Sequence, residues 1–191
     1  EKARSDAKAA AEYAHISSEG KEALKNFPKP SISMIQGYCL GGGMEVALST
    51  DFRICSEDSQ LGIPAARLSI AYSFDAIHRL YSLVGPSTAK DILITARRIK
   101  ADEALQIGLV NKVSSVADLH KEVKAYTQAI SENAPLSMQA SKLTVDEILK
   151  NPDVRNLKAI EEISKACFDS ADYREGRTAF MEKRKPIFTG S

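Results

Sequence analysis

Residues 29–54 carry the clearest structural signal in the chain and read KPSISMIQGYCLGGGMEVALSTDFRI. The alternating, β-branched segment 31–35 predicts a strand. The glycine-rich segment 37–43 predicts a turn, residues 42–49 predict a short helix, and residues 51–55 predict a second strand. A strand, a glycine turn, a helix and a strand form a βαβ unit, in which the two strands run parallel. The segment therefore indicates an α/β protein.

Helices are predicted for most of the remaining chain. The first must end at the FPKP segment, because the residue before a proline is disfavoured in the α region. Gly108 fits a glycine that ends a helix, and Ser115 with Asp118 resembles an N-terminal capping box. The predicted helices span residues 3–26, 85–96, 101–107, 115–131, 135–150, 154–168 and 172–185, and residues 109–113 are predicted as a strand. Strands and helices thus alternate early, and a run of helices follows.

The composition limits the class of protein. The chain has 191 residues, of which 43% are hydrophobic, and its formal net charge is +1. This near-neutral charge argues against a generic nucleic-acid-binding or membrane-surface protein, and no apolar run approaches the ~20 residues that cross a bilayer. The cysteines are Cys39, Cys55 and Cys167. Their odd number and wide spacing indicate buried thiols in a reducing compartment, and the three scattered histidines do not suggest a metal site.

The glycine triplet Gly41-Gly42-Gly43 and the nearby Glu45 each admit two interpretations. Glycines permit a close approach to a ligand, and the N–H groups that begin the next helix can hold an anion or a developing oxyanion. The triplet could equally be a tight strand-to-helix turn. Glu45 is favoured by the helix dipole in a first turn, and it is also placed to act as a general acid/base. Its apolar neighbours at residues 46–48 favour a dry environment.

Residues 29–54 resemble the core signature of the crotonase (enoyl-CoA hydratase/isomerase) superfamily. The resemblance continues in the family's order to about residue 188, through Leu61-Gly-Ile-Pro64, Arg79-Leu80, Leu83-Val-Gly85, Ala101-Asp-Glu-Ala104, Gly108-Leu-Val110 and residues 174–185. It implies an α/β fold, with a spiral core of ββα units followed by a C-terminal helical trimerisation region. We therefore expect residues 1–115 to form the C-terminal part of the spiral core and residues 116–191 the helical region. The family's N-terminal strands would then precede residue 1.

The resemblance also implies functional residues. In the family, the carbonyl oxygen of a CoA thioester lies between two backbone N–H groups, and Gly42 matches the second of these donors. The segment with the first donor would precede residue 1. Glu45 matches the first catalytic glutamate of the hydratases. Lys183 matches a C-terminal helix that often reaches CoA in a neighbouring subunit, and a solvated helix face would also explain this lysine. The further residues expected to contact substrate are Gly41, Gly43, Pro64, Ala65 and Tyr72.

Two segments depart from the hydratase pattern. Hydratases carry a second glutamate directly after Gly-x-Pro, where this chain has Ala65. Hydration normally uses two carboxylates, so a lone Glu45 favours isomerisation, and hydrolysis or decarboxylation is also compatible with it. In addition, residues 71–78 replace a glycine-rich loop and place Tyr72 and Phe74 at the expected pocket wall. Tyr72 or Asp75 could supply a proton there, or the segment could reshape or close the pocket.

The expected protein is an acyl-CoA enzyme of the enoyl-CoA hydratase/isomerase type, a lyase or isomerase of fatty acid metabolism. We expect it in the cytoplasm, or in the mitochondrial matrix if eukaryotic. We expect no permanently bound cofactor and no metal, with coenzyme A entering as part of the substrate. The expected partners are the acyl-CoA and further copies in a trimer or hexamer, without nucleic acid or membrane. The alternative is a catalytically weak or inactive CoA-binding or oligomerising protein of the same fold, suggested by Ala65 and residues 72–78.

Overall fold

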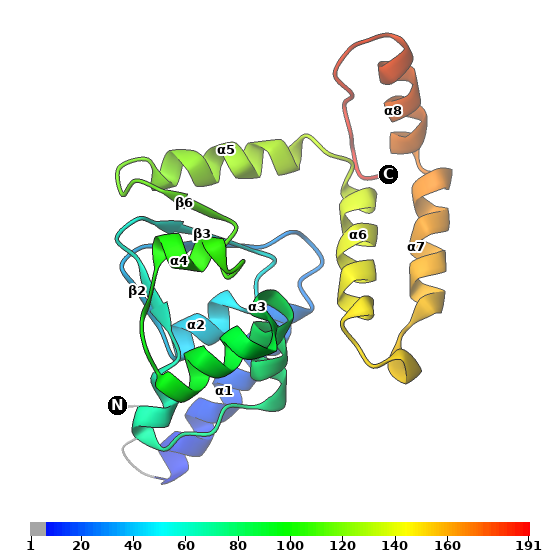
Figure 1. The fold of residues 1–191 in the computed structure, drawn as a ribbon. Helices are drawn as coiled ribbons and strands as arrows, with labels where there is room; N and C mark the ends of the chain where they lie inside the picture. The colour runs from blue at the N-terminus through cyan, green and yellow to red at the C-terminus, as the bar shows by residue number, and fades with distance from the viewer. Residues whose placement is uncertain (1–6) are drawn as a thin grey trace. The chain divides into compact units, whose positions relative to one another are not determined.

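The computed structural model describes residues 7–191, and in the first helix it describes the side chains of Glu12 and of residues 15–25. The chain forms two compact units. Unit 1 contains the described residues up to Phe27 together with Ser31–Val116, and unit 2 contains Pro28–Pro30 and Ala117–Ser191 (Figure 1). Each unit is described separately below. The assignment of residues 1–115 and 116–191 to two domains stays a prediction.

Unit 1 contains two three-stranded sheets. The first has the order β1 (Ile32–Ile35), β3 (Phe52–Ser56), β6 (Lys112–Ser114), and all its strands are parallel. The second has the order β2 (Tyr38–Leu40), β4 (Gln60–Gly62), β5 (Ile99–Lys100), with β2 and β4 parallel and β5 antiparallel. The parallel pairing of β1 with β3 confirms the predicted βαβ unit. The prediction of a continuous turn over 37–43 is wrong in its middle, where β2 lies.

Four helices and a short 3-10 helix complete the described part of unit 1: α1 (Ala7–Lys25), α2 (Gly42–Ala47), η2 (Pro64–Leu68), α3 (Phe74–Thr95) and α4 (Ala101–Gln106). The predicted start of the first helix lies outside the described residues. Helix α3 begins earlier than predicted, because the Ser73 hydroxyl accepts a hydrogen bond from the Ala76 N–H. Within α3, Gly85 adopts φ 75°, so the predicted helix from Gly85 is only its second half.

The core of unit 1 is formed by apolar side chains from both sheets and from α2, α3 and α4. Among them, Cys55, Leu61, Leu80 and Ile99 have no exposed surface. The helix α2 is short, and its C-terminal end is fixed by a buried cation. Arg53 on β3 is 3% exposed, and its guanidinium donates to the Thr50 carbonyl at 2.8 Å and the Leu109 carbonyl at 2.9 Å. This arginine therefore fixes the chain after α2 against the strand that follows it.

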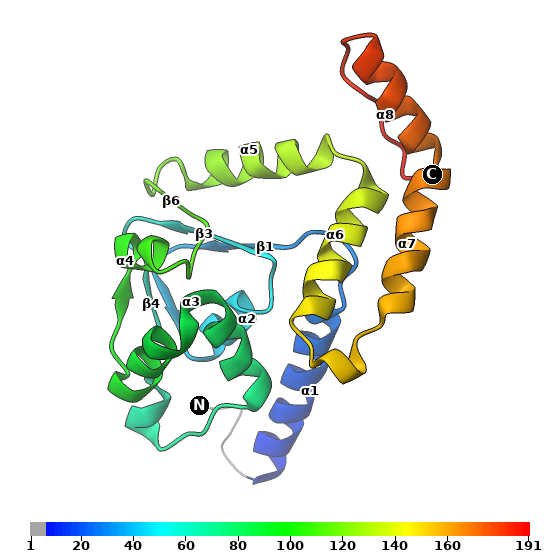
Figure 2. The same cartoon turned by 45° about the vertical axis from the view of Figure 1, so that its right-hand side comes forward.

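Unit 2 is helical and consists of α5 (Leu119–Ser131), α6 (Pro135–Ile148), the 3-10 helix η3 (Pro152–Val154), α7 (Leu157–Asp169) and α8 (Ala171–Met181). Figures 1 and 2 show α6 and α7 side by side. The predicted capping box is wrong, since α5 begins after Asp118 without a side-chain cap. The last helix also ends earlier than predicted. The segment after it returns to the start of α8, where Ala171 and Asp172 N–H groups donate to the Ser191 carbonyl.

No helix in the described range 7–191 is both long and apolar enough to span a membrane.

Candidate active site

The glycine turn leads directly from β2 into α2. Gly41 precedes the helix with φ 55° and ψ −116°, a conformation that side chains rarely permit. Its N–H donates to the Gly62 carbonyl at 2.9 Å, and its own carbonyl accepts the first helical hydrogen bond, from the Glu45 N–H at 3.0 Å. Gly42 and Gly43 begin the helix, and a Cβ atom at either position would meet nothing within 4 Å. Since the first N–H groups of a helix lack intrahelical acceptors, a ligand oxygen can approach these donors.

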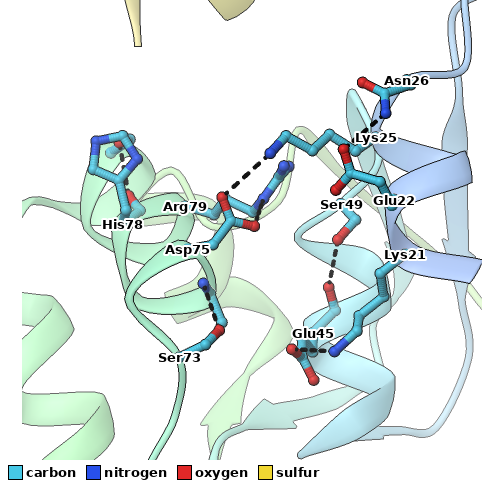
Figure 3. Close-up of polar contacts among 12 residues, drawn as sticks. Lys21, Glu22, Lys25, Asn26, Glu45, Ser49, Ser73, Asp75, His78 and Arg79 are labelled. Atoms are coloured by element: carbon cyan, nitrogen blue, oxygen red, sulfur yellow. Dashed lines mark hydrogen bonds and ion pairs between the residues drawn. The ribbon is translucent and has the colours of Figure 1, made fainter. Parts of the chain in front are cut away.

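The Glu45 side chain projects from α2 toward the C-terminal half of α1 (Figure 3). One carboxylate oxygen, Oε1, accepts a hydrogen bond from the Lys21 ammonium at 2.7 Å. The two side chains are 23% and 31% exposed, respectively, so the ion pair is partly withdrawn from water. Of its apolar neighbours, Ala47 and Leu48 are buried and Val46 is 47% exposed, so the expected dry environment around Glu45 is observed only in part.

Glu45 lines a small polar cavity of unit 1. The cavity has a volume of about 300 Å³, and its lining comes from α1, α2 and the start of α3. Its lining residues are Ser18, Lys21, Glu22, Lys25, Glu45, Ser49, Ser73, Asp75, Ala76 and Arg79. Hydroxyls, carboxylates and cations thus dominate, and the cavity offers hydrogen bonds and charges to a ligand.

Besides the pair of Lys21 and Glu45, this cavity contains a second cluster of charged side chains around Asp75. Its carboxylate lies 3.6 Å from the Lys25 ammonium and 3.2 Å from Arg79 Nε (Figure 3). Partial burial raises the pKa of Asp75, but the hydrogen bond and charge of Arg79 and the charge of Lys25 outweigh it and hold the pKa below its usual value. Asp75 is thereby stabilised as a carboxylate, which disfavours the interpretation that it donates a proton.

The other predicted pocket residues fall into different environments. Tyr72 is half-buried and packs against the core of unit 1, and its hydroxyl lies 3.8 Å from the position that a Cβ atom of Gly41 would occupy. Pro64 begins η2, and Ala65 follows it as a buried residue with 8% exposure. Phe74 is 85% exposed and stacks on His78 in the first turn of α3. Phe74 does not line the cavity that contains Glu45, and its place at a pocket wall stays a prediction.

Lys183 belongs to unit 2 and lies beyond the end of α8, not within it. Its backbone adopts φ 55°, which ends the helical path, and its side chain is exposed. The prediction of a helical lysine is wrong, whereas its role toward CoA stays a prediction.

The cysteines do not add a nucleophile to the site. Burial raises the pKa of the Cys39 thiol to about 11, so this side chain is protonated at neutral pH. Cys55 is also buried, and its pKa is raised to about 11, first by burial and then by the neighbouring Cys39 and Asp58. Both act as small apolar core residues.

Sequence reasoning singled out Asp75 but missed Lys21 and the helix start that carries Asp75. Lys21 lies 24 residues before Glu45, and no local pattern links the two. The start of α3 does leave a signal, since Ser73 is a favourable N-cap and Asp75, an acidic residue, follows in the first turn.

Comparisons with known proteins show which family the chain resembles. The chain spans 62% of the length of its relative in Clostridium acetobutylicum, a short-chain-enoyl-CoA hydratase, and is 40% identical to it over 163 residues, which are 85% of this chain. The methylmalonyl-CoA decarboxylase of Escherichia coli is 35% identical over 170 residues, covering 87% of this chain and 65% of the relative. A crystal structure of an enoyl-CoA hydratase/carnithine racemase from Magnetospirillum magneticum matches 98% of this chain and 70% of its own, with a TM-score of 0.89 and 30% identity.

The match to the solved structure confirms the crotonase-like α/β fold. The family described as enoyl-CoA hydratase/isomerase matches residues 1–191. Together with the glycine turn and the following Glu45, this match shows that the chain belongs to the enoyl-CoA hydratase/isomerase family.

Proposed function

We propose that this chain forms part of an enzyme that acts on acyl-CoA thioesters through an enolate. The Gly42 N–H donates a hydrogen bond to the thioester oxygen, which becomes negatively charged when the enolate forms. Glu45 transfers a proton at the α or γ carbon. Gly41, Gly43, Pro64, Ala65 and Tyr72 contact the acyl part of the substrate. The chemistry requires no permanently bound cofactor, since coenzyme A arrives with the substrate.

One observation carries this proposal: Glu45 stands three residues after Gly42 on the same short helix, and its carboxylate lines a cavity. A backbone donor at a helix start can stabilise the enolate oxygen, and a carboxylate in the first turn can move the proton. Position 65, which holds a glutamate in the hydratases that this chain resembles, holds a buried alanine. A single acid/base group suits double-bond isomerisation better than the addition of water.

The test is turnover of a panel of enoyl-CoA and acyl-CoA thioesters by the full-length protein, with each product identified by mass spectrometry. For the thioester that the wild type turns over, Glu45→Gln should lower kcat by about 10²–10⁴-fold, which is the usual contribution of general acid–base catalysis. Wild-type turnover that does not change in Glu45→Gln would refute the role of Glu45. A wild-type protein that binds CoA thioesters without turning any over would favour the non-catalytic alternative.

Decarboxylation is a second candidate, supported by the similarity to the methylmalonyl-CoA decarboxylase and by the single carboxylate. Loss of CO2 from a malonyl-type thioester breaks the bond between Cα and the carboxyl carbon. The electron pair enters the same thioester enolate, and a proton is then delivered to Cα. Release of CO2 from such a thioester, with no turnover of enoyl-CoA, would select this reaction over isomerisation.

We further propose that the protein assembles as a trimer or hexamer through its C-terminal helical region and works in the cytoplasm or mitochondrial matrix. Large apolar side chains are exposed in unit 2, among them Phe168, Phe180 and Met181. The cysteines are free, which fits a reducing compartment. Lys183 would contact the nucleotide end of CoA. Sedimentation analysis of the full-length protein measures the assembly, and a monomer at micromolar concentration would contradict it.

A further inference from the structure

The ammonium of Lys21 is the group that fixes the candidate acid/base residue. Lys21 lies in the C-terminal half of α1, and its Nζ donates to Glu45 Oε1 at 2.7 Å (Figure 3). Among the side chains that the structure describes, no other hydrogen-bond partner of the Glu45 carboxylate is observed. The bond therefore anchors Oε1 and leaves Oε2 without a described partner, on a side chain that lines the cavity.

This ion pair differs from an ordinary pair on a helix surface. The partners are 24 residues apart and come from two helices, so the contact depends on how α1 packs against α2. Both side chains are partly buried, at 31% and 23% exposure. A charge-assisted hydrogen bond at 2.7 Å restricts the rotamers of the carboxylate. Restricting the rotamers of a reacting group favours the geometry from which proton transfer occurs.

The other two cations of the cavity are engaged elsewhere. Lys25 lies one helical turn after Lys21 on α1, and its ammonium is 3.6 Å from Asp75. Arg79 is 3.2 Å from the same carboxylate. The cavity thus contains two separate charge clusters, Lys21 with Glu45 and the pair Lys25 and Arg79 with Asp75. The control for Lys21 is Lys90 on α3, which has the same charge and belongs to the same unit, but is exposed and does not line the cavity.

We propose that Lys21 is a positioning residue, which orients the Glu45 carboxylate so that its second oxygen can exchange a proton with the substrate. This inference rests on the proposed acid/base function of Glu45. It predicts that Lys21 acts through Glu45 and not through substrate binding. Removing its charge should therefore change kcat and leave KM nearly unchanged.

The experiment compares steady-state kinetics and exchange of the substrate's α-proton with D2O in the full-length protein. Using the thioester that the wild type turns over, Lys21→Met should lower kcat and the exchange rate by about 10–100-fold, as small misplacements of reacting groups do. KM should stay within about twofold. Lys21→Arg should recover most of kcat, and Lys90→Met should leave kcat at the wild-type value. In a Glu45→Gln background, Lys21→Met should cause no further loss, since groups that act as a unit are not additive.

Each result decides between the explanations. A Lys21→Met variant with wild-type kcat would overturn the inference. A rise in KM at constant kcat would also overturn it, since Lys21 would then be a substrate-binding residue. Equal losses in Lys21→Met, Lys21→Arg and Lys90→Met would overturn it as well, since they would indicate a general structural effect. Turnover that depends on Glu45 but not on Lys21 refutes this inference alone. Turnover that does not depend on Glu45, or a wild type without turnover, refutes the proposed function and this inference with it.

Discussion

The hydroxyl oxygen of Tyr72 lies 3.8 Å from the place where a Cβ atom on Gly41 would be. This short distance links Tyr72, in the segment before α3, to Gly41, the residue that precedes α2. Since Gly41 orients the N–H groups of Gly42 and Gly43, Tyr72 lies against the turn that presents the proposed oxyanion donor. The aromatic ring also packs on the core of unit 1, which holds the hydroxyl in this place.

Gly41→Ala should destabilise the protein by about 1–3 kcal/mol, because only glycine adopts such backbone angles without strain. The cost comes from φ 55° and ψ −116°, whereas the contact with Tyr72 at 3.8 Å is ordinary van der Waals contact. Urea unfolding measures the effect. Adding Tyr72→Phe to Gly41→Ala should restore no stability. If the double variant regains wild-type stability, the cause is a clash with the hydroxyl and the backbone argument is wrong.

Gly62→Ala should destabilise by about 1–3 kcal/mol for a different reason, which is overpacking. A Cβ atom on Gly62 would lie 2.9 Å from the backbone carbonyl oxygen of Arg97, and a backbone atom cannot move aside cheaply. The control is Gly20→Ala, in the middle of α1, where a Cβ atom meets nothing within 4 Å. That variant should be neutral or more stable by up to about 1 kcal/mol, since alanine is the better helix former. Equal loss in both variants would contradict the steric argument.

The sequence predicted the parts of the fold that local pattern encodes. The βαβ unit could be predicted because a segment of alternating apolar residues, a glycine-rich segment and a polar segment follow one another within residues 29–54. The strands β2, β4 and β5 have only two or three residues each, and they are strands because of pairing across the fold. Such short segments carry little propensity of their own, so sequence reasoning did not find them.

The site residues also divide into those that a local sequence pattern predicts and those that depend on packing across the fold. The turn at Gly42 and the placement of Glu45 in the first turn of a helix follow from the order of residues in one short segment. The Lys21 contact depends on the packing of two helices, which no local pattern reveals. Lys183 was predicted inside a helix because the predicted end of that helix was placed at Lys185, before Pro186. The chain ends α8 there with a lysine at φ 55°, a conformation usually taken by glycine.

Arg53→Met should destabilise the protein by about 1–3 kcal/mol, the cost of leaving buried carbonyl groups without a donor. The guanidinium is buried and donates to the carbonyls of Thr50 and Leu109, while burial lowers its pKa without removing its charge at neutral pH. Urea unfolding of the variant tests this expectation. Arg67→Met is the control, because Arg67 is exposed at the end of η2 and should change stability by at most about 0.5 kcal/mol.

Glu175 should make the stability of the protein depend on acid pH. Arg184 forms a bidentate pair with its carboxylate at 2.6 and 2.9 Å, and the Ile187 N–H donates at 2.9 Å. The hydrogen bonds from Arg184 and then from Ile187 lower the pKa of Glu175 from 4.5 to about 2. A folded-state pKa below the unfolded value contributes stability that is present above the unfolded pKa and lost as pH falls through the folded pKa. The window therefore lies between about pH 4.5 and pH 2.

Glu175→Gln should lower Tm by a constant amount from pH 7 down to about pH 4.5, and the gap to wild type should close toward pH 2, where the wild-type carboxylate is protonated as well. Thermal unfolding at pH 7, 4.5, 3 and 2 measures this gap. Arg184→Met removes the largest cause of the pKa shift, so it should reduce the acid sensitivity in the same window. A gap between wild type and Glu175→Gln that stays the same at every pH would show that the loss comes from packing and not from the ionised carboxylate.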